Sequence, residues 1–178
     1  MIPTVETERL VLAEWTPQDV DEYARICAIP EVMRYMWPAR PATPAESAYG
    51  VQLLREHWLR WGFGHWAVHE KDSGRFVGRT GAKRHDDWEP DPENNTEIGW
   101  LYDPAVWGRG YATEGARAAL AFCLGEVGAD EVISIAHPDN AASQRVMANV
   151  GLRYAGARHW DARGIDVVWY SNSSDEET

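Results

Sequence analysis

A run of eight residues near the middle of the chain is suited to holding an anion. It reads Trp107-Gly108-Arg109-Gly110-Tyr111-Ala112-Thr113-Glu114. Its two glycines let the backbone turn tightly and present several N–H groups together. The helix predicted to follow adds unpaired N–H donors and a positive dipole end, an arrangement suited to a pyrophosphate. A simple glycine-bearing loop is an equal alternative, because the P-loop lysine and the third glycine of a dinucleotide fingerprint are absent.

A second segment, residues 137–143, is also predicted to end a strand and open a helix. Its Asn140 and Ser143 lie three positions apart, so both side chains can face one side of the first helical turn. Helix capping by Asn140 or by Asp139 would explain the same residues without any ligand.

The third candidate is Glu97, a lone carboxylate in a predicted strand over residues 96–102. Strand alternation places it on one face with Gly99 and Leu101. Such a carboxylate lies either on a surface face or in a pocket, and the alternation alone favours the surface.

The elements that must position these segments can be predicted from periodicity and caps. Thr16 and Thr43 each precede a proline and are expected to cap helices, the second of which should end near Trp61 at Gly62. Residues 86–95 are expected to form an exposed loop, and 171–178 a flexible tail. Further strands are expected at 9–15, 66–70, from 75, 131–137 and 165–170, and further helices at 30–33, 111–127 and 140–149. Strands and helices alternate along one compact chain, so we expect a single domain over 1–178 of α/β or α+β class with a mixed sheet.

Composition excludes several classes of function. The net charge is −11 with no basic block, which argues against nucleic acid as a partner. No apolar stretch is long enough to span a bilayer and no signal peptide is evident, so we expect a soluble, cytoplasmic protein with no membrane partner. The six histidines lack metal-binding spacing, and we predict no metal site. Cys27 and Cys123 fall on apolar helix faces and are expected to be inert thiols.

Taken together and in this order, the three segments resemble the GNAT superfamily of acetyltransferases. The most similar branch is the RimJ/RimL-like group, which acetylates ribosomal-protein N-termini. The resemblance covers nearly the whole chain, and five matches in register make it specific. They lie at residues 7–12, 76–78, 97–101, 107–114 and 140–147, the last followed by Gly151-Leu152.

The resemblance implies a fold and a reaction. The fold would be a GNAT-type mixed, mostly antiparallel central sheet of about seven strands flanked by helices. A splayed strand pair in that sheet would hold the coenzyme. The protein would transfer an acetyl group from acetyl-CoA to a primary amine, either a protein N-terminus or a small-molecule amine, by direct attack in a ternary complex. An acidic surface would favour the approach of a cationic amine.

The resemblance also implies roles for individual residues. Glu97 would be the general base, which works best if burial beside Trp100 or Trp107 brings its pKa toward the working pH. Ser143 would lie near the sulfur and assist the departing thiolate, with Tyr102 and Tyr111 as reserve acids. A backbone N–H near Leu101 would stabilise the oxyanion. The residues implied in coenzyme binding are Trp100, Leu101, Tyr102, Trp107, Gly108, Arg109, Gly110, Tyr111, Ala112, Thr113, Asn140 and Ser143.

The sequence departs from the family pattern at Ala13, where arginine is common, and at Ala148 and Asn149, which replace Glu-Lys. Trp107 replaces the more common Gln or Arg, although Trp is usual in this branch. These departures leave the acceptor open. Alternatives are a coenzyme A-binding module without catalysis, a nucleotide-phosphate binder, and a covalent acetyl-cysteine route. The oligomeric state also stays open, with a homodimer among the alternatives.

Overall fold

The structure is a computed structural model, and it describes residues 1–88 and 95–173. Its centre is an eight-stranded sheet in the order β1-β2-β3-β4-β5-β6-β8-β7. The strands are β1 (Val5–Glu6), β2 (Leu10–Ala13), β3 (His65–Glu70), β4 (Phe76–Arg84), β5 (Thr96–Tyr102), β6 (Ile133–Ala136), β7 (Arg153–Trp160) and β8 (Ile165–Ser171). The helical segments are α1 (Pro17–Cys27), α2 (Pro30–Met33), α3 (Pro44–Trp61), η1 (Pro104–Val106), α4 (Tyr111–Phe122), the π-helical η2 (Cys123–Val127) and α5 (Ala141–Val150). The mixed, mostly antiparallel sheet flanked by helices is confirmed, and the short β1 is the strand beyond the expected number.

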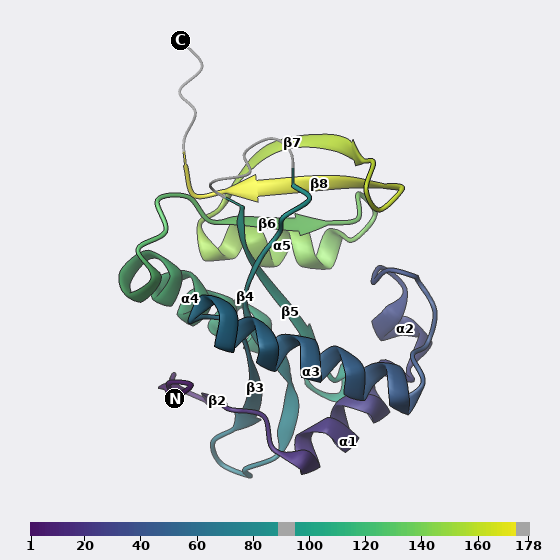
Figure 1. Ribbon diagram of the computed structural model, residues 1–178, viewed down its shortest axis with the longest axis vertical. Helices are drawn as coiled ribbons and strands as arrows, with labels where there is room; N and C mark the ends of the chain where they lie inside the picture. Colours follow the sequence, from purple (N-terminus) through teal and green to yellow (C-terminus); the bar gives the residue numbers. More distant parts are fainter. Residues whose placement is uncertain (89–94, 174–178) are drawn as a thin grey trace.

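The parallel pair β5–β6 divides the sheet, and all other neighbours are antiparallel. The two strands share one ladder pair, Glu97 with Ile133, beside which the Ser134 hydroxyl donates to the Ile98 carbonyl at 2.9 Å. Figure 1 shows β6, β7 and β8 running across the direction of β4 and β5. Past their shared pair the two strands therefore separate, and a gap opens toward the C-terminal end of β5.

Side chains of β5 alternate between two hydrophobic cores. Ile98 and Tyr102 belong to the core that α4 covers, together with the buried Trp66. Leu101 belongs to the other core, which α1 contributes to through Tyr23 and Ile26. Burial of apolar surface from both sides fixes β5 in place, so the position of the gap is determined by the two layers of helices.

The helix boundaries follow the predicted caps. Thr16 forms a capping box with Asp19, and Thr43 forms one with Glu46. Gly62 ends α3 with a φ of 75°, a left-handed conformation that glycine adopts without strain. No helix in the described ranges is long and apolar enough to cross a membrane.

Two expectations for the C-terminal part of the chain need correction. The strand β7 was not predicted, because it is an edge strand whose exposed side chains give no apolar alternation. The tail does not begin at 171, since Ser171 is buried in β8 and the Asn172 side chain accepts the Val132 N–H at 2.6 Å. Residues 174–178 lie outside the described residues.

The loop expected over 86–95 begins at the exposed Asp86, but two of its described residues are buried. Trp88 is 2% exposed and Asn95 is 1% exposed. Trp88 packs edge-on against Trp160 with ring centroids 5.2 Å apart, in a small core beneath β6 and β8. A long-range aromatic contact therefore overrides the polar local sequence, and 89–94 lie outside the described residues.

The contact between α4 and the sheet makes a testable prediction at Gly115. A β-carbon there would overlap the buried Tyr102 hydroxyl and lie 3.1 Å from the Thr80 Cγ2. We expect Gly115→Ala to destabilise the protein by about 1–3 kcal/mol through overpacking. Gly50→Ala in α3 is the matched control, since a β-carbon there meets nothing within 4 Å. It should be neutral or stabilising by about 0.5–1 kcal/mol. Equal thermal shifts for the two variants would contradict this packing.

Candidate active site

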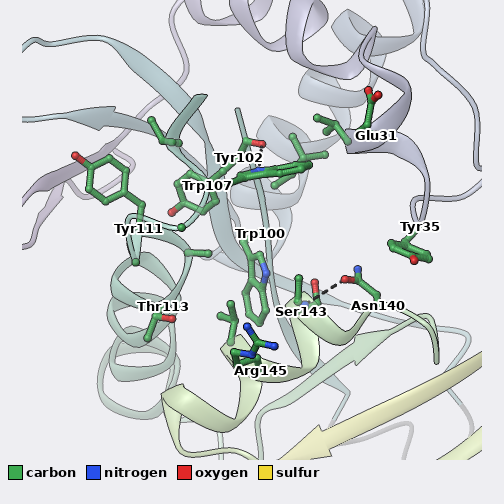
Figure 2. A pocket seen from close by; sticks show the side chains of 18 of the residues that line it. Glu31, Tyr35, Trp100, Tyr102, Trp107, Tyr111, Thr113, Asn140, Ser143 and Arg145 are labelled. Atoms are coloured by element: carbon green, nitrogen blue, oxygen red, sulfur yellow. Dashed lines mark hydrogen bonds between the residues drawn. The ribbon is translucent and has the colours of Figure 1, made fainter. Parts of the chain in front are cut away.

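A cleft of about 680 Å³ opens where β5 and β6 separate. Its walls are the short helix α2, the end of β5, the loop that leads into α4, and the first turns of α4 and α5. Figure 2 shows Trp100 in its centre between Thr113 of α4 and Ser143 of α5, with Tyr35 at its edge. The volume lies in the range of small-molecule and cofactor sites.

The loop before α4 presents backbone donors to one end of this cleft. Gly108 and Gly110 have φ values of 75° and 82°, and a β-carbon at Gly108 would meet nothing within 4 Å. Gly110 is the N-cap of α4 without a side-chain cap, and the first hydrogen bond within the helix runs from the Glu114 N–H to its carbonyl. The N–H groups of residues 111–113 therefore lack helical partners and are available to an anion.

Tyr111 is held from outside the cleft. Its hydroxyl donates to Glu70 at 2.6 Å, and its ring stacks between the guanidinium groups of Arg9 and Arg109, 4.9 and 4.6 Å from the ring centre. Arg109 pairs with Glu70 at 2.7 Å and does not line the cleft. The hydrogen bond to Glu70 raises the pKa of Tyr111, and the ring points away from the cleft in Figure 2, so this residue is not placed to act as an acid.

Tyr102 has a backbone role at the cleft and a buried side chain. Its carbonyl accepts the indole N–H of Trp107 at 2.9 Å, which fixes the half-exposed Trp107 beside the opening. Its hydroxyl is buried beneath α4 next to Gly115, and burial raises its pKa above the usual range for tyrosine. The hydroxyl therefore offers no proton to a group in the cleft.

The first turn of α5 forms the opposite wall. The Asn140 side-chain oxygen accepts the Ser143 N–H at 3.1 Å and caps the helix. This cap leaves the amide nitrogen of Asn140 and the hydroxyl of Ser143 without hydrogen bonds to the described part of the chain. Both residues line the cleft, and Figure 2 shows them side by side at its rim.

The backbone of β5 offers a second set of donors and acceptors. The Asp103 N–H donates to the Val77 carbonyl, and the Ala82 N–H donates to the Gly64 carbonyl on the other side of β4. Because backbone groups alternate in direction along an antiparallel ladder, the N–H of Leu101 points toward its partner Arg79 in β4. The backbone N–H groups of the neighbouring Trp100 and Tyr102 point the other way, into the gap. Leu101 lines the cleft, but its backbone N–H is used within the sheet.

Glu97 lies outside the cleft, at the point where β5 and β6 begin to separate. One carboxylate oxygen accepts the Ile135 N–H at 3.3 Å and the other bonds to His85 Nε2. Its side chain is 19% exposed, so the surface position that alternation favoured is wrong. Burial acts to raise the pKa of Glu97, but the charges of His85 and Lys83 outweigh it and hold the pKa below its usual value. The expected rise toward neutral pH is therefore wrong.

Several residues of the cleft were not predicted. Helix α2 was expected, but no chemical pattern marked its contribution to the wall. The unpredicted lining residues are Glu31, Val32, Arg34, Tyr35, Met36, Val106, Ala142, Arg145, Val146 and Asn149. Those of α5 fall at 142, 145, 146 and 149, a single helical face, and this spacing could have indicated them once Ser143 was placed.

The thiols and potential metal ligands give no alternative centre. Cys27 and Cys123 are free and buried, as expected. Burial raises the pKa of Cys27, and raises that of Cys123 to about 12, so neither is a ready nucleophile. Within residues 1–88 and 95–173 no group of three His, Cys, Asp or Glu residues could hold a metal ion.

Comparison with known proteins gives this architecture a family. The profile described as Acetyltransferase (GNAT) domain matches residues 9–153. FsC-acetyl coenzyme A-N(2)-transacetylase of Aspergillus fumigatus is 32% identical over 170 residues, which cover 85% of this chain and 66% of that protein. The chain thus spans just under two thirds of that relative's length.

Solved structures show the same fold. An acetyltransferase from Agrobacterium tumefaciens superposes with a TM-score of 0.81 at 23% identity, covering 98% of this chain and 96% of that one. RimL, a ribosomal L7/L12 α-N-protein acetyltransferase in complex with coenzyme A, gives a TM-score of 0.73 at 16% identity and 99% coverage of both chains. The chain belongs to the GNAT family of acetyltransferases.

The open backbone at the start of α4 makes a prediction for coenzyme binding. Gly110→Val places a branched side chain 3.3 Å or less from Arg9 Nη2 and beside the free N–H groups. We expect the fold to be kept and the affinity for acetyl-CoA to fall by at least about 100-fold, measured by calorimetry.

Gly128→Val is the matched control for that variant. Gly128 has a φ of 70° and space for a β-carbon, but it lies at the end of η2, away from the cleft. Gly128→Val places valine at a positive φ, as Gly110→Val does, so this control should lose stability but keep its affinity for acetyl-CoA. Equal affinities for the two variants would show that the 107–113 loop does not hold the coenzyme.

Proposed function

We propose that the protein transfers the acetyl group of acetyl-CoA to a primary amine by direct attack in a ternary complex. The observation that carries this proposal is the cleft between the separated strands β5 and β6. It connects the free N–H groups at the start of α4 with Ser143 on α5 along the open backbone of β5. A long, flexible thioester with a pyrophosphate at one end fits that order of groups.

The residues of the cleft suit acetyl-CoA in three places. The backbone from Trp107 to Thr113, with its two left-handed glycines, would hold the pyrophosphate. The strand-like backbone of Trp100 and Tyr102 would pair with the amide groups of the pantetheine arm. The free side-chain amide of Asn140 would donate to the same arm.

Acetyl transfer needs a deprotonated amine, a donor for the carbonyl oxygen and a proton for the leaving sulfur. Amines with pKa values of about 8–10.4 arrive mostly protonated, so a base must remove a proton. The neutral nitrogen then attacks the thioester carbon, a C–N bond forms and the C–S bond breaks. We assign the donor for the carbonyl oxygen to the Trp100 N–H instead of that of Leu101, which bonds within the sheet.

Glu97 is our proposed base, acting directly or through water, and Ser143 our proposed proton donor to the thiolate. Support for Glu97 is its place at the fork of β5 and β6, on the face of β5 opposite Trp100, and its ionised state at neutral pH. His85 bonds to the same carboxylate and would fix its position. This hydrogen bond was not expected from the sequence.

The acceptor is an amine in this proposal. The name of the Aspergillus fumigatus relative states transfer from acetyl coenzyme A to an N(2) position. RimL is named for an α-amine of a ribosomal protein. Both names support nitrogen as the acceptor atom.

The experiment that tests the function is release of free thiol from acetyl-CoA in the presence of a panel of amines. We expect acetyl-CoA to bind in calorimetry and at least one amine to accelerate thiol release over the rate without amine. Binding without acceleration by any amine would indicate a coenzyme A-binding module without catalysis. Tighter binding of ATP than of acetyl-CoA would indicate a nucleotide-phosphate binder.

Ser143→Ala tests the proposed proton donor. The substitution removes only the hydroxyl, and the backbone N–H that Asn140 caps is kept. We expect kcat to fall by more than the affinity for acetyl-CoA, as a group acting on the leaving thiolate requires. A rise in KM for acetyl-CoA with kcat intact would make Ser143 a binding residue.

Glu97→Gln tests the proposed base. The amide keeps an oxygen for the Ile135 N–H, so thermal stability should change little. We expect kcat to fall by about 10²–10⁴-fold, as for loss of a general base. Since the pKa of Glu97 is held below its usual 4.5, the limb of the pH profile that depends on it lies below about pH 4.5 and should vanish in the variant. Intact kcat with a raised acceptor KM would show that Glu97 only binds the acceptor.

A further inference from the structure

Arg79 in β4 is a partly buried cation whose partners are neutral. Its Nε donates to the Tyr23 hydroxyl at 2.9 Å and its Nη1 to His65 Nδ1 at 2.9 Å. Burial and the neighbouring Arg79 hold the pKa of His65 well below its usual value, and burial raises the pKa of Tyr23. Both partners are therefore uncharged at neutral pH, and they fix the guanidinium without compensating its charge.

No carboxylate in the described ranges lies within ion-pairing distance of Arg79, whereas Arg9, Arg25 and Arg109 each have one. The two hydrogen bonds use two of the five guanidinium N–H groups and leave three, including both on Nη2. These belong to the edge with which arginine binds a carboxylate through two parallel hydrogen bonds. A partly buried cation held by neutral groups gains most when an anion is supplied from outside.

Arg79 lies beside the part of β5 that lines the cleft. It lies directly opposite Leu101 in a hydrogen-bonded pair of the β4–β5 ladder, so the two Cα atoms are about 5.5 Å apart. Leu101 lines the cleft, and the preceding residue, Trp100, carries the N–H that we assign to the thioester oxygen. Arg79 projects from the face that α1 covers, opposite to α4, and this is also the face of Glu97.

The next ladder pairs along this face bring the His65 ring and further charged groups close to Arg79. Gly81 pairs with Gly99, and neither carries a side chain. Gly64 and His65 fill the space at Gly81, where they would overlap a β-carbon, and the His65 ring lies over Gly99, 3.4 Å from where its β-carbon would be. The following pair is Lys83 with Glu97, and the carboxylate of that pair already bonds to His85 and the Ile135 N–H. Two cations of this face, Arg79 and Lys83, thus share it with one carboxylate, Glu97, whose charge also acts on Arg79.

We propose that Arg79 binds a carboxylate of the acceptor, and that the acceptor is an amine with a carboxylate close to its reacting nitrogen, as in an α-amino acid. This inference rests on the proposed acetyl transfer. The free edge of Arg79 would hold the carboxylate, while the amine a short spacer away faces the thioester beside Trp100. The unused N–H groups of Arg79 replace the expectation, drawn from net charge alone, that the protein favours purely cationic amines.

The test compares L-amino acids with their carboxamides as acceptors in the thiol-release assay. The two sets share the amine and the side chain, and only the charge of the carboxyl group differs. We expect kcat/KM of the best amino acid to exceed that of its carboxamide by about 10- to 100-fold, the value of hydrogen bonds to a charged group. In Arg79→Gln this ratio should fall to about 1, and in Arg79→Lys, which keeps the charge without the fork, it should be intermediate.

Arg75→Gln is the control, since Arg75 is exposed and directly precedes β4, and this variant should keep the wild-type ratio. Calorimetry with acetyl-CoA checks that Arg79→Gln keeps its fold and its affinity for the coenzyme. If this variant does not fold, the test rests on the ratio of amino acid to carboxamide kcat/KM in the wild type and in Arg79→Lys. Carboxamides or simple amines accepted as well as amino acids would overturn the inference and leave acetyl transfer standing. A preference for amino acids that survives at Arg79 variants would also overturn it. No thiol release with any amine would instead overturn the proposed function itself.

Discussion

The separation of β5 from β6 after one shared ladder pair is the constraint on which the site depends. Ile98 and Glu97 hold the two strands together at the fork, through Ser134 and the Ile135 N–H. Beyond the fork, the backbone groups of β5 that face the gap have no neighbouring strand, although the other edge of β5 still pairs with β4. Unpaired backbone groups are costly unless water or a ligand satisfies them. A strand edge open inside the molecule is therefore a binding surface for an extended, amide-containing chain.

Two helices begin on either side of this gap because each follows one of the two strands. Helix α4 begins after its N-cap Gly110, which follows β5, and α5 begins after its N-cap Asn140, which follows β6, so their first turns converge on the cleft. The two starts differ: α4 has no side-chain cap, whereas α5 is capped by Asn140. The start of α4, whose N–H groups are not capped, is suited to a diffuse anion such as pyrophosphate. At the start of α5, the Asn140 cap holds the backbone of Ser143 in position at the cleft.

The sequence was most informative where structure depends on local chemistry. The capping boxes of Thr16 and Thr43 and the left-handed Gly62 are determined by residues within one helical turn, and they were predicted. The bonds from His85 to Glu97 and from His65 to Arg79 join different strands, and no local pattern indicates them. His65 and His85, which looked scattered in the sequence, thus each bond to a charged residue on one face of the sheet. The family resemblance supplied the fold, while the electrostatics of the acceptor face required the structure.

The most direct test of this account is hydrogen exchange of individual β5 amides, measured by NMR with and without saturating acetyl-CoA. The ladder directs the N–H groups of Trp100 and Tyr102 into the gap and that of Leu101 toward Arg79. We predict that acetyl-CoA slows exchange at Trp100 and Tyr102 at least about 10-fold, whereas Leu101 is protected in both states. Unchanged exchange at Trp100 and Tyr102 in the saturated protein would contradict the claim that the open edge of β5 holds the coenzyme.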